Sequence, residues 1–277
     1  MRIRIIDAFT DRPFAGNPAA VCLLDGDTWP DEGWMQQVAA ELQLSETAFA
    51  HPLPPGANAD ADWALRWFTP EVESKLCGHA TLATAHAMHR DRGTPGTVRF
   101  VSRSGVLVAH TAEDGTITLD FPAAPASEVP APDGLAQALG AAPDATYTTG
   151  ALGDLLAVFA NEAAVRALAP DFGAVARIAR RDGIRGIIAT ASAPGGAAGY
   201  DFVSRFFAPA DGIPEDPVTG SAHTALAPFW SSRLGRDGLT GLQASARGGL
   251  VRTSVHGDRV HLTGHAVVVL DGTLTAA

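Results

Sequence analysis

Lysine and cysteine are almost missing from this chain of 277 residues, and both shortages exclude particular chemistries. Lys75 is the sole lysine, so we expect neither a phosphate-binding Gly-x-x-x-x-Gly-Lys-Ser/Thr loop nor a Schiff-base lysine in an apolar pocket. Cys22 and Cys77 are the only cysteines, too few for a disulfide framework or a structural zinc site. Because no Gly-x-Gly-x-x-Gly follows the first predicted strand, a Rossmann cofactor site is not expected either.

Long apolar runs and positive charge are also scarce. No window approaches the roughly 18 apolar residues that a membrane helix needs. The formal net charge of −10 disfavours nucleic acids and anionic membrane surfaces as partners. Residues Met1–Asp7 alternate like a strand and lack the apolar core and cleavage site of a signal peptide. We therefore expect a cytoplasmic protein with no nucleic-acid partner and no membrane contact.

Two stretches of the chain resemble each other, Cys77–Ala83 and Thr219–Ala227. In each, a glycine and a polar residue are followed by small and aliphatic residues that favour a helix. Each is preceded by a strand-like run that ends in an aromatic-x-Pro sequence, Trp67–Pro70 in one copy and Phe206–Pro209 in the other. A strand, a turn and a glycine-opened helix used twice indicate two related halves.

The pattern of elements predicts an α+β protein with two pseudo-symmetric domains, each a curved, mostly antiparallel sheet wrapped around a central helix. The Ala- and Pro-rich segment 122–132 is the predicted linker, so the halves are 1–122 and 123–277. The sequence leaves open whether the last strand stays with the second half or packs back on the first. With 46% hydrophobic residues, either half can bury a core.

Glu46 is a carboxylate beside two apolar clusters, where a predicted helix gives way to a strand. Two interpretations are open. The side chain is either a solvated charge at a helix end or a partly desolvated carboxyl. In the second case its pKa would rise toward neutrality, which suits a general acid/base.

The two glycine-opened helix starts are the other candidate binding elements. Glycine lets backbone N–H groups approach a ligand closely, and a helix start favours an anion by about 0.3–1 kcal/mol at exposed positions. His79 is either a proton carrier or a capping and packing residue, and Cys77 is a candidate buried hydrophobe. The segment from Asp216 to Ser221 is either a ligand cradle or an N-cap with a turn proline. Asn17 either contacts a ligand or bonds to its own loop.

These residues are compatible with proton transfer that needs no cofactor. Two helix starts facing one cleft would bind a carboxylate and stabilise charge that develops beside it. A positioned acid/base such as Glu46 would add about 10²–10⁴-fold in rate.

Six blocks of the sequence resemble the PhzF (phenazine-biosynthesis-like) family. They span nearly the whole chain in the order found in that family, so the resemblance is specific. The blocks are Asp7–Val21, Leu44–Phe49, Arg66–Pro70, Leu76–Ala83, Glu215–His223 and Ser245–Gly249.

The resemblance implies the fold of diaminopimelate epimerase, with an active site between two pseudo-symmetric domains, and usually a homodimer. The founding phenazine enzyme isomerises trans-2,3-dihydro-3-hydroxyanthranilate without metal or cofactor, by moving a proton along the ring. The resemblance therefore implies a small, anionic, cyclic carboxylate as substrate and the activity of an isomerase. Glu46 corresponds to the general acid/base of the family. The other implied site residues are His79 and Asp216 as catalytic groups and Ser45, Gly78, Gly220 and Ser221 as substrate-binding groups.

Two alternatives remain beside the isomerase. Epimerases and racemases of this fold use two cysteines, one at each helix start. Cys77 occupies the first position, but aligning the two copies puts Thr219 at the second. A two-cysteine racemase therefore lacks one base, whereas an epimerase that uses Glu46 as its one base stays open. The second alternative is a small-molecule binding protein that turns nothing over.

Overall fold

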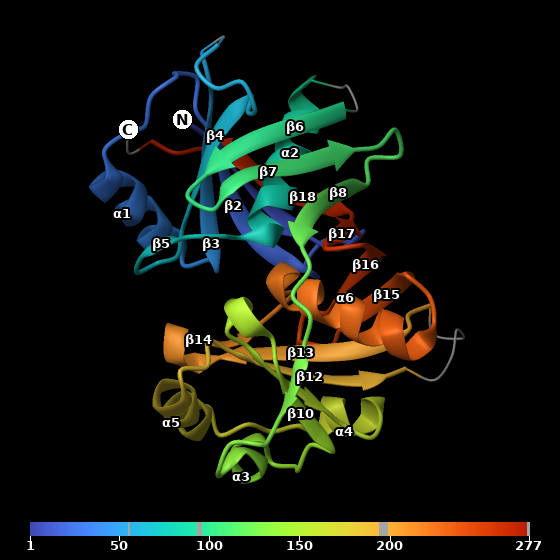
Figure 1. The fold of residues 1–277 in the computed structure, drawn as a ribbon. Coiled ribbons are helices and arrows are strands. Elements are labelled where there is room, and N and C mark those ends of the chain that lie inside the picture. The colour runs from blue at the N-terminus through green and yellow to red at the C-terminus, as the bar shows by residue number, and fades with distance from the viewer. Residues whose placement is uncertain (55, 93–95, 194–198, 276–277) are drawn as a thin grey trace. The chain divides into compact units, whose positions relative to one another are not determined.

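The computed structural model describes residues 1–54, 56–92, 96–193 and 199–275 (Figure 1). The chain divides into two units by its internal contacts. Unit 1 contains Met1–Asp120 and Thr263–Ala277, and unit 2 contains Phe121–Leu262. In the part of the chain that is described, no helix has the length and apolar character needed to cross a membrane.

Unit 1 is a sheet with helices α1 and α2. Strand β1 lies between β2 and β18 and is antiparallel to both, which joins the two ends of the chain in one sheet. The helices are α1 (Glu32–Leu42) and α2 (Gly78–Arg92). The strands are β1 (Arg2–Ala8), β2 (Asn17–Leu23), β3 (Glu46–Pro52), β4 (Trp63–Phe68), β5 (Glu73–Ser74), β6 (Gly96–Ser102), β7 (Gly105–Thr111), β8 (Ile117–Pro122) and β18 (Ala266–Thr273).

The two helices of unit 1 have different burial patterns. Asp31 caps α1, since its Oδ2 accepts the N–H of Trp34 at 3.0 Å, and the buried residues Met35, Val38 and Ala39 face the sheet. By contrast, α2 is buried on nearly all sides and packs against β1, β2, β3 and β7. A helix surrounded in this way is the centre around which the sheet curves, as predicted.

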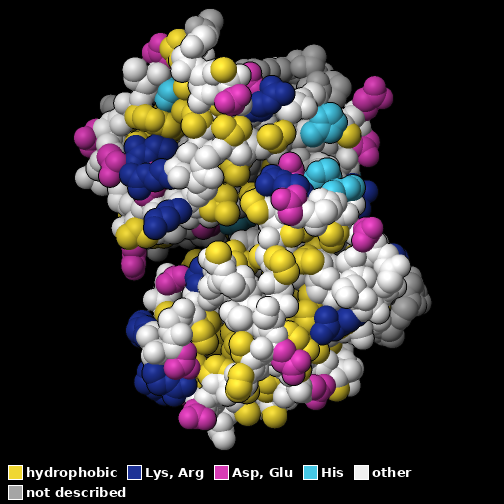
Figure 2. Space-filling model, in the orientation of Figure 1, with side chains coloured by type: hydrophobic (Ala, Val, Ile, Leu, Met, Phe, Trp, Pro, Cys, Tyr) yellow, Lys and Arg dark blue, Asp and Glu magenta, His cyan; other side chains and the backbone are white. Residues whose placement is uncertain are grey.

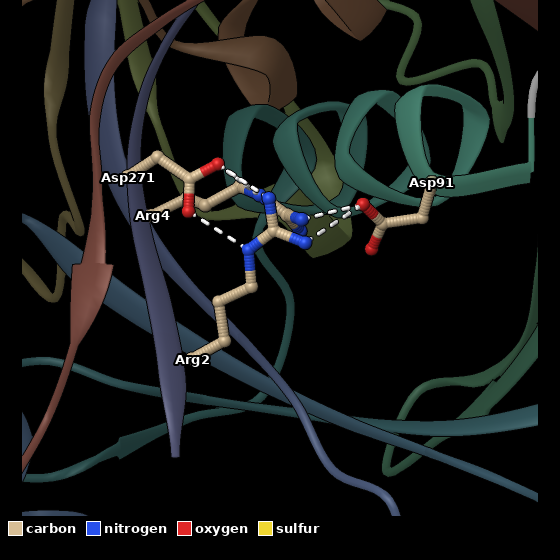
Figure 3. Close-up of polar contacts among 4 residues, drawn as sticks. All are labelled: Arg2, Arg4, Asp91 and Asp271. Carbon is tan, nitrogen blue, oxygen red and sulfur yellow. Dashed lines mark hydrogen bonds and ion pairs between the residues drawn. The ribbon is translucent and has the colours of Figure 1, made fainter.

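Ion pairs connect β1 with β18 and with the C-terminal end of α2 (Figure 3). The guanidinium groups of Arg2 and Arg4 lie between the carboxylates of Asp271 and Asp91. Arg4 is buried, and its Nη2 lies 2.5 Å from Asp91 Oδ1 and its Nε 3.3 Å from Asp271 Oδ2. Hydrogen bonds from Arg2 and Arg4 lower the pKa of Asp271 to about 2. The buried guanidinium is therefore paired, as burial of a charge requires.

Unit 2 has a sheet with helices on both faces (Figure 1). Alternate residues of the central strands point to opposite faces. Leu155, Ile187 and Phe207 pack with α3, α4 and α5, whereas their neighbours Leu156, Ile188 and Phe206 pack with α6. The helices are α3 (Leu135–Leu139), α4 (Glu162–Ala167), α5 (Phe172–Asp182) and α6 (Gly220–Leu234), with 3₁₀ turns η1 (Gly150–Leu152) and η2 (Pro209–Asp211). The strands are β9 (Ser127–Val129), β10 (Ala145–Thr148), β11 (Leu155–Val158), β12 (Ile187–Ser192), β13 (Phe202–Ala208), β14 (Ile213–Asp216), β15 (Gly238–Gln243), β16 (Gly249–His256) and β17 (Arg259–Gly264).

The same succession of elements occurs in both units. In unit 1, β2 and β3 are parallel, β3 and β4 antiparallel, and the chain returns through α2 to place β6 parallel to β4. In unit 2, β11 and β12 are parallel, β12 and β13 antiparallel, and the chain returns through α6 to place β15 parallel to β13. The repeat inferred from the sequence is therefore a repeat of structure, with α2 and α6 as equivalent helices.

The face of the molecule in Figure 2 carries acidic and basic side chains interspersed with apolar ones. On this face both acidic and basic side chains are present.

Candidate active site

Three elements of unit 1 bring Asn17, Glu46 and His79 together. Asn17 begins β2 and Glu46 begins the neighbouring parallel strand β3, where Glu46 is in register with Ala19. The chain reaches Glu46 through Gln43, which ends α1 in the left-handed conformation at φ 52°. His79 is the second residue of α2, which packs on both strands.

The imidazole of His79 is the centre of this cluster. Its Nε2 lies 3.3 Å from Glu46 Oε2, and its Nδ1 lies 3.1 Å from the amide nitrogen of Asn17. The sulfur of Cys77 lies 3.5 Å from the same Nδ1. Every nitrogen of the ring therefore faces a polar group of unit 1.

Glu46 is largely removed from solvent, with 12% of its side chain exposed. The strand that it begins continues with fully buried residues, Thr47, Ala48 and Phe49. This placement agrees with the interpretation of Glu46 as a partly desolvated carboxyl and disagrees with a solvated helix-end charge. A carboxylate in such a position, in contact with an imidazole, is a suitable acid/base.

Ser45 and Gly78 flank this cluster in the sequence. Ser45 immediately precedes Glu46 and is partly buried, and Gly78 is the first residue of α2. Both therefore lie beside the residues that contact His79. Their predicted role in substrate binding stays a prediction.

The site also contains three side chains that could together bind a metal ion, those of Glu46, Cys77 and His79. Each offers one ligand atom, and these atoms lie within 4.8 Å of one another. Carboxylate, thiolate and imidazole are the three ligand types that proteins use for Zn²⁺. Among the residues that the structure describes, this group is the candidate for holding such an ion.

Asp216 lies in unit 2, buried at the end of β14. Its Oδ2 accepts a hydrogen bond from Thr219 Oγ1 at 2.5 Å. The amide of Gln243 holds this turn: its nitrogen donates to Asp216 O at 2.7 Å and its oxygen accepts the N–H of Thr219 at 2.8 Å. Thr219 precedes α6, but its hydroxyl does not cap the helix. The interpretation of this segment as a simple N-cap is therefore not what the structure shows.

Gly220 and Ser221 are the first two residues of α6. Ser221 Oγ accepts a hydrogen bond at 3.0 Å from Arg185 Nη2, which also lies 2.5 Å from Asp154 Oδ2. Burial raises the pKa of the Asp154 carboxyl to about 6, and the guanidinium opposes that shift. Ser221 is therefore oriented by an ion pair between a buried carboxylate and a partly exposed guanidinium.

Sequence reasoning missed Arg185, Asp154 and Gln243, which come from segments with no motif of their own. Their proximity to α6 arises from pairing between strands far apart in the chain. The Gly-Asn-Pro sequence predicts that Asn17 is a loop residue that bonds to a ligand or to its own backbone. In the structure Asn17 instead contacts His79, which the sequence does not indicate.

Comparison with known proteins shows which sequences and folds this chain is similar to. The family model PhzC-PhzF, described as phenazine biosynthesis-like protein, matches residues 6–272. A Pseudomonas aeruginosa protein named as an uncharacterized isomerase is 47% identical over 270 residues, which are 97% of this chain and 96% of the relative. The crystal structure of a PhzF-family phenazine biosynthesis protein from Enterococcus faecalis has a TM-score of 0.87 and 40% identity, covering 98% of this chain and 97% of that one.

A predicted epimerase from Pseudomonas aeruginosa shares the fold at a TM-score of 0.73 and 22% identity, covering 100% of this chain and 99% of that one. The predicted α+β fold of the diaminopimelate-epimerase type is thereby confirmed, and so is the resemblance seen in the sequence. The relatives and the fold support an isomerase-type enzyme. The chain belongs to the PhzC-PhzF family of phenazine biosynthesis-like proteins.

Proposed function

We propose that this protein is an isomerase that moves a proton within a small, cyclic carboxylate, with Glu46 as the general acid/base. The observation that carries the proposal is the contact between Glu46 Oε2 and His79 Nε2, 3.3 Å apart and mostly buried. A carboxylate beside an imidazole in a water-poor position can accept a proton from carbon and return it.

The proposed step breaks one C–H bond of the substrate and forms another. Glu46 takes the proton, the electron pair moves into the conjugated ring, and the same carboxyl delivers the proton to a second carbon of that ring. Atoms and charge balance without oxidant, metal or cofactor, and a positioned acid/base contributes about 10²–10⁴-fold in rate.

The substrate carboxylate would be bound by helix starts. We propose Gly78 at the first turn of α2, with Ser45 beside it, as one set of donors. Backbone N–H groups at such a position are not used within the helix and favour an anion. We propose the same role for Gly220 and Ser221 at the start of α6, with Asp216 as a further catalytic group.

A one-base epimerase is the second candidate, because relatives of this fold include a predicted epimerase. The arrangement at α6 weakens a two-cysteine version, since Thr219 stands at the second position and donates its hydroxyl proton to Asp216. Racemisation at a carbon beside a carboxylate needs proton delivery to the opposite face, for which a second base is the usual device.

Proton NMR in D₂O of trans-2,3-dihydro-3-hydroxyanthranilate with the wild-type protein and with Glu46→Gln tests the proposal. We expect a rearranged product that carries deuterium with the wild type alone. Turnover by Glu46→Gln would overturn the assignment of the base. Ligand-dependent thermal stabilisation without exchange, across a panel of cyclic acids, would instead favour the alternative of a binding protein.

We also propose that the protein acts as a homodimer, as its family resemblance implies. Light scattering coupled to size-exclusion chromatography would check this. A mass of one chain at micromolar concentration would contradict it.

A further inference from the structure

An arginine–glutamate ion pair of the same geometry occurs in each unit. In unit 1, Arg66 Nε and Nη2 donate to the two carboxylate oxygens of Glu73 at 2.7 and 2.6 Å. In unit 2, Arg205 Nε and Nη2 donate to the two oxygens of Glu215 at 2.8 and 2.9 Å. The four side chains are between 6% and 19% exposed. Both pairs are therefore bidentate and mostly buried, an arrangement that fixes geometry as well as charge.

The two pairs occupy equivalent positions in the repeated fold. In β5 the residue after Glu73 pairs with Trp67, and in β14 the residue after Glu215 pairs with Phe206. In each unit the arginine is the residue before this aromatic one, and its guanidinium lies over the ring of the phenylalanine that follows. The distance from Cζ to the ring centroid is 5.0 Å in unit 1 and 4.9 Å in unit 2. The ion pair is therefore part of the repeat, as helices α2 and α6 are.

The residue that follows the glutamate differs between the two units. Ser74 follows Glu73, whereas Asp216, the proposed catalytic carboxylate of unit 2, follows Glu215. Because neighbouring side chains of a strand point to opposite faces, holding Glu215 on one face fixes the direction of Asp216 on the other. There Asp216 Oδ2 accepts a hydrogen bond from Thr219 Oγ1 at 2.5 Å. The orientation of this carboxylate therefore depends on its own hydrogen bond and on the ion pair of the preceding residue.

Each arginine also contacts a neighbouring helix. Arg205 Nη1 donates to the carbonyl oxygens of Val165 and Leu168 at 3.3 and 2.7 Å, where α4 ends. In unit 1, Arg66 Nη2 donates in addition to Glu32 Oε2 at 2.6 Å, at the start of α1. A planar guanidinium holds these partners at the same time, whereas a lysine ammonium has three donors and no fixed fork. Each arginine therefore joins the segment before a helix start to a second helix of its unit.

We propose that Arg205 is a positioning residue that acts through Glu215 and holds Asp216 in its orientation in the turn before α6. Arg66 and Glu73 hold the equivalent segment before α2 in the same way. The inference rests on the proposed catalytic role of Asp216 and adds the residues that orient it. A mostly buried ion pair stabilises a fold little more than apolar side chains of similar size would, so stability alone does not explain its presence in both units.

Arg205→Lys and Arg66→Lys test the inference, because lysine keeps the positive charge and loses the bidentate contact. Arg166→Lys is the matched control. Arg166 lies in the same unit as Arg205 and also pairs with a glutamate, but that partner, Glu162, is one turn away on the same helix and the guanidinium is more exposed. The measurement is backbone hydrogen exchange of the substrate-free proteins, followed by mass spectrometry.

We expect Arg205→Lys to raise the exchange rates in segment 213–221 by about tenfold or more and to leave segment 73–80 unchanged. Arg66→Lys should show the reverse pattern, and Arg166→Lys should change neither segment. With trans-2,3-dihydro-3-hydroxyanthranilate as substrate, Arg205→Lys should lower kcat by about tenfold with little change in KM. A misplaced catalytic group slows the reaction more than it weakens substrate binding.

Unchanged exchange in segment 213–221 of Arg205→Lys would overturn the inference. Equal increases in both segments would overturn it too, because they indicate a general loss of stability, and so would an unaltered kcat beside raised exchange. If Arg205→Lys does not fold, Glu215→Gln gives the same comparison, since glutamine keeps the shape and one acceptor oxygen. The exchange data need no turnover, so an active Glu46→Gln variant would refute the proposed function without changing them.

Discussion

The hydroxyl of Thr219 donates a hydrogen bond to the carboxylate of Asp216, with 2.5 Å between Oγ1 and Oδ2. Thr219 stands where a two-cysteine racemase would have its second thiol. In this chain that position serves to orient a buried carboxylate, and Gln243 holds both residues in place. The relationship gives this helix start a role in fixing Asp216 rather than in removing a proton.

Thr219→Val should therefore lower turnover while leaving the fold intact. Valine keeps the shape, but the hydrogen bond to the Asp216 carboxylate is lost. A bond to a charged group contributes about 1.5–3 kcal/mol, so kcat should fall by about 10–100-fold. Thr253→Val is the matched control, since Thr253 is also buried and its hydroxyl donates to Leu239 O. Equal turnover of the two variants would show that the hydrogen bond to Asp216 does not contribute to kcat.

Zn²⁺ should inhibit the enzyme by binding Glu46, Cys77 and His79. These ligand atoms lie within 4.8 Å of one another, and an ion there would occupy the proposed base. We expect inhibition that a chelator reverses. Because a thiolate is a strong zinc ligand, Cys77→Ala should raise the half-inhibitory concentration by about tenfold or more. The activity of the wild type and of Cys77→Ala is each measured relative to the same protein without metal. Equal inhibition of both proteins by Zn²⁺ would contradict binding at this site.

Gly16→Ala should destabilise the protein and, through Asn17, the candidate site. The backbone of Gly16 has φ 64°, and an added Cβ would lie 2.2 Å from the carbonyl oxygen of Ala8. The left-handed conformation and the clash with backbone together should cost about 2–4 kcal/mol of unfolding free energy. Gly26→Ala is the control, because a Cβ there meets nothing within 4 Å. Denaturant unfolding measures the stability of both variants. Equal free energies of unfolding would show that position 16 does not require glycine.

His86 in α2 should make the fold sensitive to acid. Burial, assisted by the charges of Arg90, His89 and Arg4, lowers the pKa of His86 to about 4 from an ordinary 6.5. Neither of its ring nitrogens has a hydrogen-bond partner among the described residues. Above pH 6.5 the ring is neutral in both states. As the pH falls from 6.5 to 4 the unfolded chain takes up the proton first, so stability is lost across this window.

His86→Met tests this by removing the titrating group and filling the same space with a flexible apolar side chain. The loss of unfolding free energy between pH 7 and pH 4 should shrink by up to about 3 kcal/mol. A part of the slope should persist, because burial lowers the pKa of His223 to about 4 as well. Identical pH dependence of the variant and the wild type would contradict the assignment.

Much of the fold could be predicted from the sequence. The duplicated strand–turn–helix pattern at Cys77–Ala83 and Thr219–Ala227 corresponds to the equivalent helices α2 and α6. It was visible because glycine, small residues and aromatic-x-Pro are local signals, each determined by backbone conformation within a few residues. The resemblance of the motifs to a known family gave the epimerase-type architecture as well.

The contacts around the candidate site needed the tertiary structure. Glu46 and Asn17 were both noticeable in the sequence, but their shared partner, His79, lies on another element. The register of β2 with β3 and the docking of α2 on both place the three side chains together.

The sequence by itself determined the residue types of the candidate site and the two related halves, because those follow from local pattern. Only the tertiary structure decided that Asn17 faces Nδ1 of His79 and that Arg185 holds Ser221. Such contacts depend on strand register and helix packing, which sum many weak interactions between distant segments. A one-residue change of register would turn the same side chains to the other face of the sheet.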